Sequence, residues 1–121
     1  MYQSTLPPGI KPELLPKPAG YKLLIAIPEV KNKTSGGILI PDSSTSVEKT
    51  ASILAYVVKT GPDAYSDPDK FPNGPYCKEG DWIIMHSYSG TRFRQGDVDY
   101  RLINDDTVEA VVEDPSLYRR A

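Results

Sequence analysis

The stretch Lys78-Glu-Gly-Asp-Trp-Ile-Ile-Met85 decides how this chain folds. Its first half is a polar turn that contains one glycine, and its second half is a run of four apolar residues. A short apolar run that begins directly after a turn is typical of a strand buried on both faces, since a helix needs a longer period. The stretch therefore predicts a central strand, with the rest of the fold on either side of it.

Comparable stretches flank this strand in both directions along the chain. Upstream, we expect strands over 21–27 and 52–58, which end at Pro28 and at a Gly-Pro pair. Downstream, we expect strands over 99–103 and 107–113, separated by a tight Asn-Asp-Asp turn. Taken together, the chain is expected to form about six short strands and no convincing helix. This pattern predicts an all-β protein, a small barrel or sandwich.

The expected core comes from the apolar positions of these strands. Tyr21, Leu23, Ile25 and Ile27 alternate along the first strand and should share one face. The other expected core residues are Val57, Val58, Trp82, Ile83, Ile84 and Met85.

Three segments do not fit this strand pattern. Residues 1–17 are rich in proline and predict an extended arm before a domain at 18–114, and 115–121 form a short tail. Residues 29–50 and 62–79 are two long loops without helical period. Loops of this length are usually functional or disordered. The first contains Gly36-Gly37 followed by Ile38-Leu39-Ile40.

Composition excludes several classes of function. The net charge is −2, from 14 basic and 16 acidic residues, so no basic excess is present to hold a phosphate backbone. One cysteine and one histidine are too few for a structural zinc site. The absence of an internal disulfide, of a secretory signal and of a membrane-spanning run predicts a cytosolic protein.

Individual reactive residues have structural interpretations. Cys77 is interpreted as incidental, although a nearby lysine, here Lys78, can lower the pKa of a thiol. Asp105 and Asp106 are interpreted as hairpin-turn residues, not an acid–base pair. The acids of the 62–79 loop lack the glycine and the final acid of an EF-hand.

Six segments, taken in order, resemble the chaperonin-10 family, the GroES-type co-chaperonins. They are Pro18–Ile27, Ser35–Ile40, Ala55–Gly61, Lys78–Met85, Tyr88–Thr91 and Tyr100–Val112. The resemblance covers about residues 18–113 and marks a divergent member, with a cellular or viral origin left open. The arm at 1–17 is longer than the family's usual N-terminus.

The resemblance implies a GroES-like β-barrel with a flexible mobile loop at about 29–50 and a roof loop at about 62–79. It implies a heptameric ring that caps a chaperonin-60 of the GroEL type and encloses unfolded client proteins. The chain itself would need no cofactor, because the partner uses ATP and magnesium. Ile38, Leu39 and Ile40 would bind the chaperonin, and Gly36 and Gly37 would act as the loop hinge. In the family, the first and last strands of neighbouring subunits pair, which corresponds to 21–27 with 107–113 here.

Alternatives stay open at this stage. Short aliphatic runs are usually core, so Ile38-Leu39-Ile40 is also compatible with a buried strand. Tyr88 fits either the enclosed cavity or packing on its neighbours. A barrel that binds single-stranded nucleic acid would use Tyr56, Tyr88, Phe93 and Tyr100 with Arg92, Arg94 and Arg101. A structural assembly subunit is a further alternative. An enzyme is disfavoured, because zinc ligands and a dinucleotide fingerprint are missing.

Overall fold

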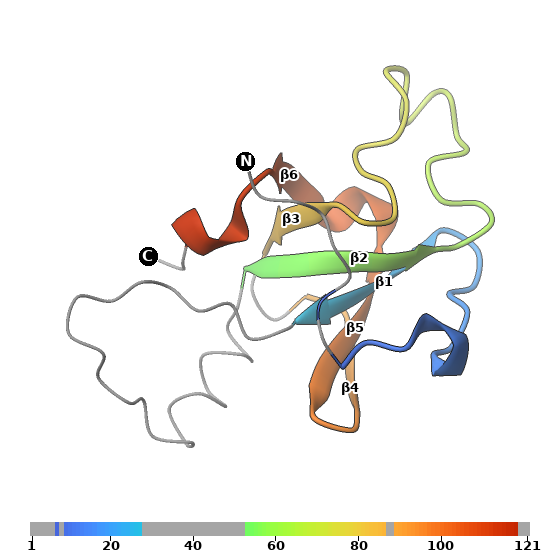
Figure 1. Ribbon diagram of the computed structural model, residues 1–121. Helices are drawn as coiled ribbons and strands as arrows, with labels where there is room; N and C mark the ends of the chain where they lie inside the picture. The colour runs from blue at the N-terminus through green and yellow to red at the C-terminus, as the bar shows by residue number, and fades with distance from the viewer. Residues whose placement is uncertain (1–6, 8, 28–52, 87–88, 119–121) are drawn as a thin grey trace.

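The computed structural model describes residue 7 and residues 9–27, 53–86 and 89–118 (Figure 1). In these ranges the chain forms six strands and three short 3-10 turns, and no α-helix. The strands are β1 (Lys22–Ile27), β2 (Leu54–Thr60), β3 (Trp82–Met85), β4 (Thr91–Gln95), β5 (Val98–Asn104) and β6 (Val108–Val112). The 3-10 turns are η1 (Pro12–Leu14), η2 (Asp105–Thr107) and η3 (Pro115–Leu117). None of the described helices is long and apolar enough to cross a membrane.

The strands form one antiparallel sheet in the order β4-β5-β1-β2-β3-β6. The sheet is strongly twisted, so that β4 and β5 run across the direction of β2 and β3 (Figure 1). This arrangement confirms the predicted all-β class and the small barrel. The central strand expected at 82–85 is present with those bounds.

Both faces of the sheet carry an apolar core, because successive residues of a strand point to opposite faces. Leu23, Ile25 and Ile27 of β1 pack in the first core, whereas Leu24 and Ala26 pack in the second. The first core also contains Ala55, Val57, Cys77, Ile83, Met85, Ile103 and Val108. The second contains Ile10, Leu15, Tyr56, Val58, Trp82 and Tyr100. The expected core is confirmed apart from Tyr21, which is exposed, and Ile84, which is half-buried.

Several boundaries differ from the prediction. Tyr21 is exposed in the turn before β1 and does not join the face of Leu23. Strand β2 continues to Thr60, because the next N–H, that of Gly61, donates to the carbonyl oxygen of Lys22 at 2.8 Å. The last strand is shorter than 107–113, because Thr107 belongs to η2.

The prediction that 21–27 pairs with a neighbouring subunit is wrong for β1. Its two edges are already hydrogen-bonded within the chain, to β5 on one side and to β2 on the other. A strand has only two edges, so no edge of β1 is left for another subunit. Strand β6 differs, since in the described part of the chain it pairs with β3 alone.

Candidate functional site

Two neighbouring strands hold the ends of the segment that the sequence singles out for binding. The chain leaves the described part at Ile27, the last residue of β1, and re-enters it at Ile53, just before β2. Strands β1 and β2 are antiparallel neighbours, with Ala26 opposite Tyr56. The carbonyl oxygen of Ile53 accepts the N–H of Met85 at 2.8 Å, which joins this end to β3. The segment therefore starts and ends on hydrogen-bonded strands of the sheet.

The sequence-predicted site residues lie outside this described part. Gly36, Gly37, Ile38, Leu39 and Ile40 fall within residues 28–52, and Tyr88 falls within 87–88, neither of which the structure describes. Their proposed roles therefore stay predictions. What the structure supplies is the surface that surrounds their attachment points.

A hollow of about 250 Å³ lies beside Ile27, between β1 and the β4–β5 hairpin. Its lining is Ile27, Arg92, Phe93, Arg94, Asp99, Tyr100 and Arg101. The Arg94 Nε atom lies 2.9 Å from Asp99 Oδ1, and the Phe93 ring stacks on Tyr100 with centroids 5.4 Å apart. The hollow thus combines aromatic rings with arginines, the residue types that the nucleic-acid alternative requires.

Burial argues against nucleic-acid binding at this hollow. Tyr56, Tyr100 and Arg101 are buried, so their rings and guanidinium group do not form an open stacking surface. Arg94 is held by Asp99. Phe93 is half-buried, and Arg92 is the exposed cation that remains of the set. Base stacking needs exposed aromatic faces along a basic groove, which these residues do not offer.

The 61–81 loop lies at the opposite end of β1 and β2 from Ile27 and Ile53 (Figure 1). It begins at the N-terminal end of β1, where the N–H of Asp63 donates to the carbonyl oxygen of Gly20 at 2.9 Å. It ends where Gly80 donates its N–H to the carbonyl oxygen of Val57, also at 2.9 Å. The 61–81 loop and the attachment points Ile27 and Ile53 therefore lie at opposite ends of β1 and β2.

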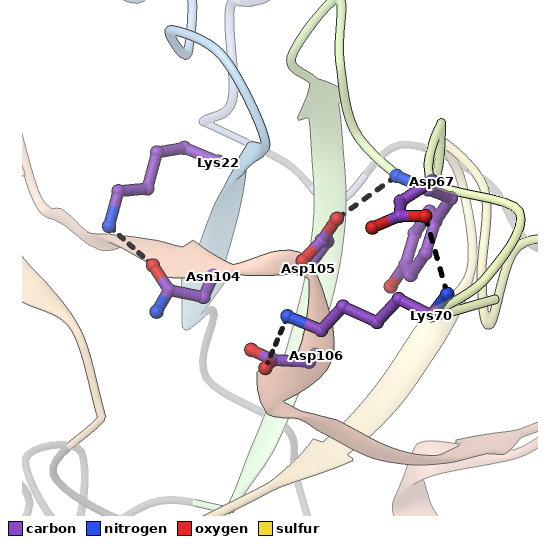
Figure 2. A network of polar contacts seen from close by, with 7 residues as sticks. Lys22, Asp67, Lys70, Asn104, Asp105 and Asp106 are labelled. Carbon is purple, nitrogen blue, oxygen red and sulfur yellow. Dashed lines mark hydrogen bonds and ion pairs between the residues drawn. The ribbon is translucent and has the colours of Figure 1, made fainter.

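The acid pair of the η2 turn holds this loop on the barrel (Figure 2). Asp105 is 3% exposed, and its Oδ2 atom accepts the N–H of Tyr65 at 3.0 Å. Asp106 is exposed and forms an ion pair with Lys70, with Nζ and Oδ2 2.9 Å apart. Asp106 also raises the pKa of Lys70 through this contact. The two acids are structural, as the sequence predicts, but they join two distant segments instead of shaping a simple hairpin.

Side chains of the loop form a small core of their own. The rings of Tyr65, Phe71 and Tyr76 contact one another with centroids 4.9 to 5.4 Å apart, mostly edge to face. Asp67 stabilises a turn within the same loop, since its Oδ1 atom accepts the N–H of Asp69 at 2.9 Å. This packing makes 61–81 a compact loop. The sequence predicted the loop but not its aromatic cluster. The presence of three aromatic residues in one loop was a signal that could have indicated the cluster.

Cys77 lies under this aromatic cluster. The thiol is buried in the first core, and the Tyr65 hydroxyl lies 3.4 Å from its Sγ atom. Burial raises the pKa of the Cys77 thiol, and the Tyr65 hydrogen bond only partly offsets this. Burial, and not the adjacent Lys78, therefore sets the direction of the pKa shift of this thiol. A protonated, buried thiol is a poor nucleophile.

The described residues contain no cluster of three or more His, Cys, Asp or Glu that could hold a metal ion. His86 is exposed at the end of β3. The acid pair and the thiol of Cys77 both have structural partners.

Comparison with known proteins gives one consistent result. The family model of the chaperonin 10 kDa subunit matches residues 16–112. The co-chaperonin GroES of Caldicellulosiruptor saccharolyticus is 34% identical over 98 residues, which cover 81% of this chain and 97% of the relative. The co-chaperonin GroES of Corynebacterium diphtheriae is 30% identical over 97 residues, which cover 80% of this chain and 93% of the relative.

Proposed function

This chain belongs to the chaperonin 10 kDa subunit family, and from that premise we propose that it caps a ring-shaped, ATP-dependent chaperonin and encloses client proteins while they fold. The observation that carries the proposal is the family match over 16–112, which spans the whole sheet from β1 to β6. The partner would be a chaperonin-60 of the GroEL type. ATP and magnesium would belong to that partner.

The binding element of this proposal is Ile38-Leu39-Ile40. Burying one aliphatic side chain is worth roughly 1.5–3 kcal/mol, so three supply about 5–9 kcal/mol before costs. Ordering a loop costs about 1–2 kcal/mol per residue, so a dozen ordered residues cancel this gain. One loop alone therefore binds weakly, and several loops on one ring bind together through linkage. Weak single contacts also allow release when the partner changes shape.

The strands that hold the ends of the 28–52 segment, β1 and β2, suit the binding role of the triplet. The aliphatic triplet begins 11 positions after Ile27 and ends 13 positions before Ile53, so an extended chain lets it reach at most about 40 Å from the barrel. Both attachment points adjoin the hydrogen-bonded strands β1, β2 and β3. Gly36 and Gly37 would let the backbone turn into the partner's groove. Tyr88 would face the enclosed cavity.

A ring of seven subunits is the assembly we propose. Since β1 has no open edge, the joint must use other elements. Strand β6 pairs with β3 on one side, and its Val111 side chain is 47% exposed. An unpaired strand edge with exposed apolar side chains offers backbone groups to another chain. We therefore place one side of the subunit joint at β6.

Native mass spectrometry of the chain with a tetradecameric chaperonin and ADP tests this function. The expected result is a complex of one chaperonin with a seven-membered ring of this chain. Leu39→Asp should abolish the complex while the ring and the far-UV circular dichroism stay unchanged, because a charge cannot enter an apolar groove. Ser44→Asp, a charge placed outside the triplet, is the matched control and should still bind. Loss of the folded signal in Leu39→Asp would instead identify the triplet as core.

A further inference from the structure

Residues 9–15 precede the family match, which begins at residue 16. The matched parts of the relatives already make up 93% and 97% of their own lengths, so they leave few residues to correspond to this segment. The segment nevertheless belongs to the folded body. Ile10 is 5% exposed and Leu15 is 6% exposed, values typical of core residues.

The apolar contacts of the segment are all on one face of the sheet. Ile10 and Leu15 pack in the second core with Tyr56, Trp82 and Tyr100, which come from β2, β3 and β5. Gly9 approaches β5 so closely that a Cβ atom added to it would lie 3.3 Å from the Val98 side chain.

Polar contacts from two separate strands hold the same segment. The Gln95 Nε2 atom on β4 donates to the carbonyl oxygen of Leu14 at 3.0 Å. The Lys59 ammonium group on β2 donates to the carbonyl oxygen of Leu15, also at 3.0 Å. In the sheet order, β5 and β1 lie between these two strands. The two carbonyl groups are adjacent at the C-terminal end of η1, so side chains from two strands that are not neighbours in the sheet converge on this end of the segment.

We propose that residues 9–15 are a strap that closes the second apolar face of the sheet from within the same chain. The face is rich in aromatic side chains, and exposing it would be costly in water. With the strap in place, this face needs no neighbouring subunit or other partner to cover it. The inference goes beyond the capping function, and it holds or fails independently of any chaperonin.

The chain contains a built-in reporter and a built-in control for the strap. Trp82 is the sole tryptophan, is 2% exposed and lies in the face that the strap closes. Leu14 belongs to the strap but is 62% exposed, so its side chain contributes little to the closure. A charge at position 10 should therefore open the face, whereas the same charge at position 14 should not.

The experiment compares Ile10→Asp, Leu15→Asp and Leu14→Asp in the full chain by acrylamide quenching of Trp82 fluorescence and by thermal unfolding. We expect Ile10→Asp and Leu15→Asp to raise the quenching constant at least about twofold, with a red-shifted emission, because water reaches the indole when the strap opens. Leu14→Asp should match the unaltered chain. If Ile10→Asp and Leu15→Asp unfold while Leu14→Asp stays folded, the milder variant Ile10→Ala is measured instead. It should raise the quenching constant by a smaller amount.

Two results would overturn the strap. One is unchanged Trp82 quenching and an unchanged thermal midpoint in both Ile10→Asp and Leu15→Asp. The other comes from diluting the unaltered chain until sedimentation shows monomers only. If Trp82 then becomes accessible, a neighbouring subunit covers the face; if it stays protected, the strap does.

Discussion

The buried carboxylate of Asp105 accepts the backbone N–H of Tyr65 at 3.0 Å, across 40 positions of the chain. Tyr65 has a φ of +59°, and no other described residue apart from glycines has a positive φ. A left-handed backbone costs roughly 1–2 kcal/mol for an ordinary residue. The Asp105 bond and the aromatic cluster around Tyr65 offset this cost and fix the 61–81 loop on the barrel.

Replacing Asp105 should loosen this loop. Asp105→Ala leaves the Tyr65 N–H without its acceptor, and we expect a loss of about 1–3 kcal/mol in the free energy of unfolding. Urea unfolding measures the loss, and hydrogen exchange should show faster exchange at Tyr65. Asp106→Ala is the matched control, because its exposed ion pair with Lys70 is screened by water and contributes little. Equal losses in the two variants would contradict this assignment.

Cys77 should react slowly and make the fold sensitive to alkali. Its pKa is raised in the folded chain, chiefly by burial, so the folded state disfavours the thiolate. The stabilising effect is therefore complete below the unfolded pKa and is lost as pH rises through the folded pKa. The pKa of the Tyr65 hydroxyl is raised as well, also chiefly by burial. Its ionisation at high pH should therefore destabilise the fold too.

Two measurements check this behaviour. Thiol labelling at pH 8 should be much slower in the folded chain than in urea, because the thiolate is the reactive form. Thermal midpoints should fall above about pH 9, and Cys77→Ala should make this fall shallower. A thiol that labels equally fast in both states would show that the 61–81 loop opens readily.

Gly61 should tolerate no side chain. A Cβ atom added there would lie 2.3 Å from the carbonyl oxygen of Gly20 and 2.9 Å from that of Lys22, and both are backbone atoms that cannot rotate away. We expect Gly61→Ala to cost about 2–4 kcal/mol in urea unfolding. Gly20→Ala is the comparison, since it meets no atom within 4 Å and its φ of +56° alone should cost about 1–2 kcal/mol. A smaller loss at 61 than at 20 would refute the steric argument.

Val111→Lys should separate ring assembly from folding. Val111 is 47% exposed on β6, an edge strand of the sheet as described, so the free energy of unfolding of the monomer should change little. A charged lysine on an open strand edge hinders pairing with another chain. Native mass spectrometry should therefore show fewer complete rings. Glu113→Lys, just beyond the strand, is the control, and an unchanged oligomer in Val111→Lys would place the joint elsewhere.

Local patterns predicted most strands but missed β4. The run Thr91–Gln95 contains two arginines and a single large apolar residue, Phe93, so nothing in it indicates a strand. It becomes one because β5 lies beside it and supplies hydrogen-bonding partners from Val98 to Leu102. The same limit explains the contact between Tyr65 and Asp105, since no local rule joins residues so far apart.

What the sequence determined by itself is every strand except β4, the buried faces of most of these strands, and the family. Alternation and turn residues act within a few positions, so they can be read without the fold. Only the tertiary structure decided which strand edges are paired, how Cys77 is buried, and that residues 9–15 close the second face. Those features depend on contacts between distant segments, such as Leu15 with Lys59, and such contacts exist only once the sheet has formed.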